Sequence, residues 1–203
     1  MGQHVNYKQR YRTKQARFWA SSYEDKRPEL TNAQRKMLSH YDNATLYNDS
    51  IVAQIVKRFQ KQDAIVIYVP DHGEECYEEN RGFICRNHSA EIDWPLAHYE
   101  FEIPFWIYCS PKYIRNHRDI YRQIRKAKDK RFMTDALPHL LLYLAGIETP
   151  TYKEEYNILS PKYDEMRPRI LKNSADYDKL RDAHLEKIKK EESKKVKKKE
   201  RRN

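Results

Sequence analysis

The sequence predicts an α/β fold, because two short apolar runs typical of strands are interleaved with segments of helical periodicity. Residues 63–69 read Asp-Ala-Ile-Val-Ile-Tyr-Val and are apolar from the second position on. This composition is typical of a strand buried on both faces of a parallel sheet. Residues 103–109 form a second run of the same kind. We expect both strands to lie in one mixed or parallel sheet.

Helical patterns precede and follow these strands. Thr31 and Gln34 fit a capping box, in which each side chain bonds to the backbone of the other residue. Apolar residues then recur at helical spacing as far as Phe59, which predicts a helix over 33–59. The other expected elements are helices at 117–128 and 132–145, the latter ended by Gly146, an irregular segment at 151–172, and a charged helix from about Ala175.

Length and composition favour one domain with a tail. The chain has 203 residues, of which 39% are apolar and 34% charged, and its mean hydropathy is −1.05. We expect a domain over 1–172 and a basic helical or disordered tail over 173–203. No stretch of about 18 apolar residues occurs, and the start lacks the apolar region of a signal peptide. The sequence therefore predicts neither a membrane span nor a secretory leader.

The tail carries much of the positive charge. Residues 186–203 contain ten Lys or Arg against four Glu, a net +6 of the chain's +10. One interpretation is a solvated helix with no specific partner. The other is attraction to an anionic membrane surface, which contributes up to ~1 kcal/mol per basic residue. Nucleic acid would attract the same charges without specificity.

The chain places a carboxylate and an imidazole together at the end of the first strand. Pro70 stops this strand, and Asp71-His72-Gly73-Glu74 follows. Open α/β sheets bind ligands at the carboxyl ends of their strands, and an oxygen ligand beside a nitrogen ligand suits Zn²⁺ or Mn²⁺. Gly73 is expected to let the backbone turn sharply. An ordinary turn at a strand end is the alternative interpretation.

Several further motifs stand in a fixed order around this one. They are Met1-Gly2-Gln3-His4, Tyr41-Asp42-Asn43, Asp71–Glu74, His88, the strand 103–108 and the helix around 135–146. Together, over about residues 1–150, they resemble the catalytic domain of bacterial phosphoethanolamine transferases, in the sulfatase and alkaline phosphatase-like superfamily. The resemblance implies the C-terminal part of an αβα sandwich, followed here by a basic helical tail.

The resemblance also implies a function. It is zinc-dependent transfer of phosphoethanolamine from phosphatidylethanolamine to lipid A or a glycan, at the periplasmic face of the bacterial inner membrane. Asp71 and His72 would be metal ligands, with Zn²⁺ preferred over Mn²⁺, and His4 and His88 would hold the phosphoryl group. We expect these four side chains to converge on one pocket. Tyr41-Asp42-Asn43 is expected to have a structural role.

No catalytic nucleophile is assigned within the sequence. The resemblance places an acidic metal ligand and a threonine nucleophile ahead of the Met-Gly-x-His motif, and Thr13, Thr31, Thr45 and Thr134 do not stand in that context. Met1 coincides with a methionine that is internal in the family, which is interpreted as a truncated gene, an internal start or a fragment. We therefore expect weak zinc binding and little turnover by this chain.

Two cysteines follow the metal motif and leave two interpretations open. Cys76 and Cys85 could form a loop disulfide, which fits an oxidising compartment. Alternatively, His72, Cys76, Cys85 and His88 could form a structural zinc knot, although the spacing matches no standard pattern. Cys109 is expected to be a core thiol.

Two alternative functions remain open at this point. One is a sulfatase-type or phosphodiesterase-type ester hydrolase, the nearest variant within the superfamily. The other is a non-catalytic basic protein that binds anionic lipid or nucleic acid through the tail, with nucleic acid the less favoured partner.

Overall fold

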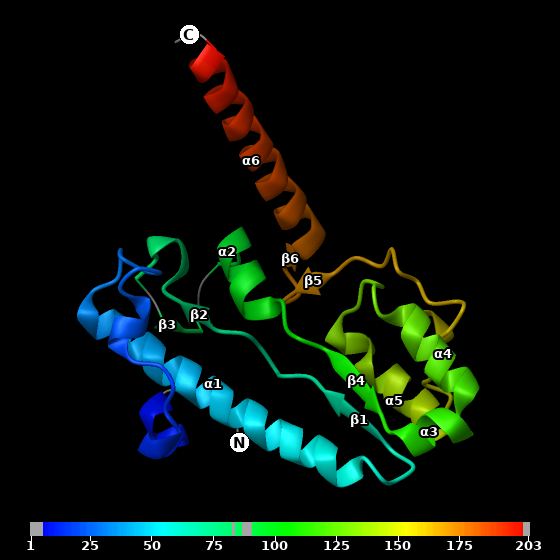
Figure 1. Ribbon diagram of the computed structural model, residues 1–203. Helices are drawn as coiled ribbons and strands as arrows, with labels where there is room; N and C mark the ends of the chain where they lie inside the picture. Colours follow the sequence, from blue (N-terminus) through cyan, green and yellow to red (C-terminus); the bar gives the residue numbers. More distant parts are fainter. Residues whose placement is uncertain (1–5, 83, 87–90, 201–203) are drawn as a thin grey trace. The chain divides into compact units, whose positions relative to one another are not determined.

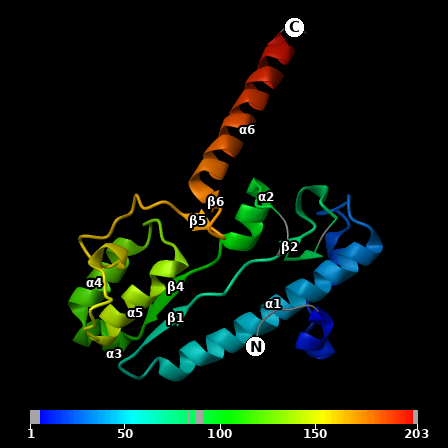
Figure 2. The ribbon, with the colours of Figure 1, turned by 180° about the vertical axis from the view of Figure 1, so that it is seen from behind.

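The computed structural model describes residues 6–82, 84–86 and 91–200, which fold as two compact units. The first unit comprises Met1–Ala90 and His98–Lys112, and the second comprises Glu91–Ala97 and Tyr113–Asn203. Figures 1 and 2 show the helices and strands of each unit from opposite sides. The chain mixes helices and strands, as expected for an α/β fold.

One long helix and short strands make up the first unit. Its elements are the 3-10 turns η1 (Tyr7–Arg10), η2 (Thr13–Gln15), η3 (Ala20–Tyr23) and η4 (Glu78–Asn80), the helix α1 (Asn32–Phe59), and the strands β1 (Ile65–Tyr68), β2 (Glu75–Cys76), β3 (Ile84–Cys85) and β4 (Trp106–Cys109). A π-helical turn, η5, covers Ala97–Phe101. The capping box is confirmed, because Thr31 Oγ accepts from Gln34 N and the Gln34 side chain accepts from Thr31 N at 2.8 Å.

The two predicted strands lie in one sheet, as expected, and they run antiparallel, which the expected mixed sheet allows and a parallel sheet does not. β1 pairs with β4 antiparallel, from Ile65 opposite Cys109 to Tyr68 opposite Trp106. At the last pair, the Tyr68 and Trp106 rings stack with centroids 5.1 Å apart, a contact that stabilises antiparallel neighbours. All four β1 residues are half-buried rather than buried, because this sheet has two strands within the described part of the chain. α1 runs alongside β1 in both views (Figures 1 and 2).

A buried asparagine on α1, Asn43, bonds to the backbone of the amino-terminal segment, residues 7–23. Asn43 is 2% exposed and uses all of its hydrogen-bonding capacity. Its Oδ1 accepts from the backbone N–H groups of Arg17 (2.6 Å) and Phe18 (3.1 Å). Its Nδ2 donates to the carbonyls of Phe18 (2.8 Å) and Ser39 (2.7 Å). The Asn43 side chain thus bonds to backbone N–H and carbonyl groups of this segment, as a neighbouring strand would.

The two residues before Asn43 hold other parts of the same segment. The ring of Tyr41 meets that of Tyr7 edge to face, with centroids 5.3 Å apart, and Tyr23 donates its hydroxyl proton to Asp42. Burial raises the pKa of Asp42, although the Tyr23 hydrogen bond opposes that shift. The Tyr-Asp-Asn triplet therefore contacts the amino-terminal segment at Tyr7, Phe18 and Tyr23, which confirms the structural role expected for it.

The second unit is mainly helical. Its elements are α2 (Trp94–Leu96), α3 (Pro111–Asn116), α4 (Arg118–Ala127), η6 (Thr134–Ala136), α5 (Leu137–Ala145), η7 (Glu154–Tyr156), β5 (Ile170–Leu171), β6 (Ala175–Asp176) and α6 (Tyr177–Glu200). α5 starts later than predicted, because Pro138 favours the first turn of a helix and is disfavoured further in. Gly146 ends α5 in the left-handed conformation with φ 65°, as predicted. Within the described residues, no helix is both long and apolar enough to cross a membrane.

Replacing the asparagine that fixes the amino-terminal segment should destabilise the first unit. Asn43→Ala leaves the N–H groups of Arg17 and Phe18 and the Phe18 carbonyl without their partner, and we expect the free energy of unfolding to fall by about 3 kcal/mol. Urea unfolding followed by tryptophan fluorescence measures the change. Asn48→Ala, further along the same helix, is the matched control and should cost under about 1 kcal/mol. Equal losses for both variants would contradict the role given to Asn43.

Candidate metal and phosphoryl site

The predicted metal motif lies in a loop directly after β1, and a close backbone contact holds the loop in place. Gly73 N donates to Glu100 O at 2.8 Å. A Cβ atom at position 73 would lie 2.2 Å from the carbonyl oxygen of Tyr99, closer than any real contact. Glycine is therefore required here because the 99–100 backbone approaches so closely. The expectation that Gly73 supplies a sharp turn gave the wrong reason for its presence.

This loop also fixes the tautomer of His72. The ring Nδ1 lies 2.7 Å from the carbonyl oxygen of Gly73, and Nε2 contacts the guanidinium of Arg86. A carbonyl can only accept a hydrogen bond and a guanidinium can only donate one. Nδ1 therefore carries the proton and Nε2 offers its lone pair. A backbone carbonyl on the far nitrogen is the usual way to orient a metal-binding histidine.

Asp71 and His72 present their ligand atoms to the same point. Asp71 Oδ2 lies 3.5 Å from His72 Nε2. Two ligands of a tetrahedral Zn²⁺, each about 2.1 Å from the metal, are separated by about 3.4 Å. The pair thus fits two corners of a zinc site. The Asp71 side chain is 86% exposed and that of His72 is 22% exposed, so a cation can reach them from solvent.

Arg86 is a residue that the sequence reasoning did not assign to the site. Its guanidinium donates to the nitrogen that a metal would need, so a metal would have to displace Arg86 from His72. The signal was present in Arg86-Asn87-His88, because an arginine beside a proposed phosphoryl ligand suits anion binding.

Tyr7 is the second residue that was missed. Its hydroxyl donates to Glu74 Oε2 at 2.8 Å across 67 positions of sequence. Burial raises the pKa of Tyr7 well above its usual range, and the Glu74 carboxylate raises it further, so the phenol remains a proton donor. The contact brings the segment that follows Met-Gly-Gln-His against the Asp-His-Gly-Glu loop. His4 and His88 themselves lie outside the described residues, and their convergence with Asp71 and His72 stays a prediction.

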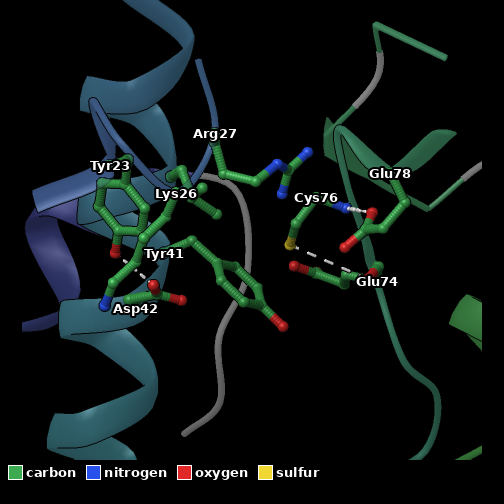
Figure 3. Close-up of a pocket in the computed structure, with 9 residues that line it drawn as sticks. Tyr23, Lys26, Arg27, Tyr41, Asp42, Glu74, Cys76 and Glu78 are labelled. Atoms are coloured by element: carbon green, nitrogen blue, oxygen red, sulfur yellow. Dashed lines mark hydrogen bonds between the residues drawn. The ribbon is translucent and has the colours of Figure 1, made fainter. Parts of the chain in front are cut away.

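A cavity of about 380 Å³ opens beside Glu74 (Figure 3). It is lined by Tyr23, Lys26, Arg27, Leu38, Tyr41, Asp42, Glu74, Cys76 and Glu78. The phenol of Tyr41 lies between Asp42 on one side and Glu74 on the other. Arg27 is already paired with Glu29 at 2.5 Å, which leaves Lys26 facing the three carboxylates of Asp42, Glu74 and Glu78. This excess of negative charge disfavours a phosphate in the cavity.

The cysteine interpretations fail on strand geometry. β2 pairs with β3 so that Glu75 faces Cys85 and Cys76 faces Ile84. Neighbouring positions of a ladder point to opposite faces, so Cys76 and Cys85 diverge, and both are free thiols. Burial also raises the pKa of Cys76, with Glu78 and Glu74 adding to the shift, which disfavours the thiolate that zinc needs. A zinc knot sharing these two residues does not fit, and His88 lies outside the described residues.

Other candidates are accounted for elsewhere. Thr31 caps α1 and the Thr45 hydroxyl donates to Tyr41 O at 3.0 Å, so both are structural. Cys109 is half-buried at the end of β4. In the part of the chain that the structure describes, no three or more His, Cys, Asp or Glu side chains gather as a metal site.

Relatives of this chain are phosphoethanolamine transferases. It is 31% identical over 168 residues to phosphoethanolamine transferase EptC of Escherichia coli O18:K1:H7, a match that covers 81% of this chain and 28% of that protein. It is also 31% identical over 133 residues to the Kdo(2)-lipid A phosphoethanolamine 7''-transferase of Escherichia coli K12, covering 64% of this chain and 22% of that protein.

The fold agrees with a solved relative. The crystal structure of the C-terminal periplasmic domain of Escherichia coli EptC, in complex with Zn, matches with a TM-score of 0.69 at 28% identity. The match covers 87% of this chain and 49% of that one, so the chain spans about half the length of the solved domain. The predicted fold, part of an alkaline phosphatase-like domain, is confirmed. The family model described as Sulfatase matches residues 1–147, and the chain therefore belongs to the sulfatase family.

Proposed function

We propose that this chain contributes a metal half-site and phosphoryl-binding residues to zinc-dependent transfer of phosphoethanolamine to lipid A or a glycan. The observation that carries the proposal is the pair Asp71 and His72, with ligand atoms 3.5 Å apart and the His72 tautomer set for coordination. The transferase relatives and the zinc-containing relative support the same reading. Residues 1–172 would form the catalytic part and 173–203 a basic helical tail whose base packs on that part.

The proposed roles of the site residues follow from their side-chain chemistry. Asp71 and His72 would hold Zn²⁺, which when bound supplies positive charge that stabilises a transferred phosphoryl group. Charge stabilisation is most of what a phosphoryl-transfer site contributes. His4 and His88 would hold the phosphoryl oxygens or the leaving group, and Arg86 adds a fixed positive charge next to His72. The nucleophile is assigned to no residue of this chain.

The partners follow from the relatives. We infer phosphatidylethanolamine as donor and lipid A or a glycan as acceptor, at the periplasmic face of a bacterial inner membrane, with an anionic membrane surface met by residues 186–203. A relative that acts on Kdo(2)-lipid A and a solved relative that is a periplasmic domain support this setting. A sulfatase-type hydrolase is less favoured, because the curated relatives matched here are transferases.

Zinc titration of the 203-residue chain tests the half-site. We expect weak binding, since two protein ligands fill half of a tetrahedral shell. Asp71→Asn and His72→Gln each remove a proposed zinc ligand. Each should lower the zinc affinity by at least roughly 10- to 100-fold, because the loss of a residue that only orients a ligand already costs that much. Calorimetry and competition with a chromogenic chelator give the affinity. Asp49→Asn, an exposed aspartate on α1, is the control. An unchanged zinc affinity in both variants would show that Asp71 and His72 are not metal ligands.

Arg86→Gln should act in the opposite direction. Because Arg86 donates to His72 Nε2 and repels a cation, its loss should raise the zinc affinity and lower the affinity for inorganic phosphate. Arg58→Gln serves as control, since Arg58 is an exposed arginine on α1 and its loss removes the same charge. Weaker zinc binding in Arg86→Gln would show that Arg86 orients His72 instead of competing for it.

Transfer itself is best tested with a complete site. We expect a fusion of this chain to the amino-terminal part of the EptC catalytic domain to transfer fluorescent phosphatidylethanolamine headgroups to lipid A. Asp71→Asn should slow this by roughly three orders of magnitude, and the unfused chain should show little turnover. Rapid turnover by the unfused chain that is lost in Asp71→Ala would contradict the proposal. Hydrolysis of p-nitrophenyl sulfate by the fusion at a higher rate than its transfer to lipid A would also contradict it.

A further inference from the structure

The basic tail is helical as far as Glu200 and carries lysines along one side. The lysine face comprises Lys187, Lys190 and Lys194, which share one side of an α-helix because they are three and four positions apart. All three side chains are exposed, and α6 is helical throughout this stretch. In the sequence, Lys197 and Lys198 continue the spacing. We propose that this face docks the protein onto an anionic phospholipid surface, which deepens the proposed function and rests on it for the choice of partner.

The base of α6 is held firmly within the second unit. Asp178 accepts hydrogen bonds from Arg169 at 2.6 Å and from Arg131. These arginines, Arg169 first, hold the pKa of Asp178 below its usual range. The ring of Trp94 stacks on that of His184 with centroids 5.2 Å apart. The first two turns of α6 are therefore part of the fold, and they fix the direction of the rest.

From Leu185 to Lys195, α6 contributes no side chain to a core. Every side chain from Leu185 to Lys195 is exposed, and the ion pair between Lys190 and Glu186, at 3.7 Å, is a weak surface contact. A helix of this length without packing is marginal in water. An oppositely charged surface would stabilise it by neutralising the lysines, whose place at the carboxyl end already suits the helix dipole.

Geometry decides which lysines meet such a surface. An α-helix with its side chains is about 10–12 Å across, whereas charges in physiological salt are screened beyond about 8 Å. Only lysines on the side that meets the lipid should therefore contribute. Lys189 and Lys195 lie away from the lysine face, Glu192 lies opposite it, and Glu186 and Glu191 flank it. A lipid surface is favoured over nucleic acid because the solved relative is a periplasmic domain.

Co-sedimentation of the 203-residue chain with vesicles tests the proposal. The vesicles are pure phosphatidylcholine or phosphatidylcholine mixed with phosphatidylglycerol. Two double variants are compared, K187Q/K194Q on the lysine face and K189Q/K195Q away from it. Each removes two charges from α6, and none of these four lysines forms an ion pair with another described residue. We expect binding to the phosphatidylglycerol vesicles only, falling with added salt. K187Q/K194Q should lower the partition coefficient roughly 25-fold, and K189Q/K195Q less than about threefold.

Two readouts separate this proposal from the proposed function. Far-ultraviolet circular dichroism should show more helix when phosphatidylglycerol vesicles are added, and Asp71→Asn should leave vesicle binding intact while zinc binding falls. Equal losses in the two lysine variants would mean that net charge alone attracts the protein, and would overturn the lysine face. No binding to phosphatidylglycerol, or tighter binding to duplex DNA at the same salt concentration, would overturn the lipid partner.

Discussion

The hydrogen bond from Tyr7 to Glu74 joins the parts of the chain on which the candidate site depends. It ties the amino-terminal segment to the metal loop across 67 positions of sequence. Residues 17 and 18 of that segment are fixed on α1 by three hydrogen bonds of Asn43. Tyr7 and Asn43 are both buried, so losing either contact would leave buried polar atoms without their partner. The loop and the segment therefore hold one another in place.

Backbone contacts fix the conformation of the candidate metal loop. The 99–100 backbone lies so close to Gly73 that a side chain cannot be accommodated, and the Gly73 carbonyl in turn sets the proton on His72. Arg86 donates to the lone pair of the other ring nitrogen. If Asp71 and His72 hold Zn²⁺ as proposed, the metal would replace the guanidinium contact, and the Gly73 carbonyl would keep the ring orientation of His72.

Local rules predicted the helices well, and non-local contacts accounted for the failures. The capping residues Thr31 and Gln34 and the terminator Gly146 act within one helical turn, so their roles could be predicted. Strand direction depends on pairing between residues about 40 positions apart, and the apolar composition of 63–69 gave no information on it. Likewise, the roles of Tyr7, Gly73 and Arg86 come from partners distant in sequence, whereas Asp71 and His72 stood next to one another and could be identified as a pair.

The central claim is that Asp71 and His72 form half of a zinc site, and anomalous scattering at the zinc absorption edge tests it most directly. Crystals of the 203-residue chain soaked in Zn²⁺ should show a peak about 2.1 Å from both His72 Nε2 and an Asp71 carboxylate oxygen, with the Arg86 guanidinium displaced from His72. A peak at the Cys76 or Cys85 sulfur instead, with His72 still bonded to Arg86, would contradict the account.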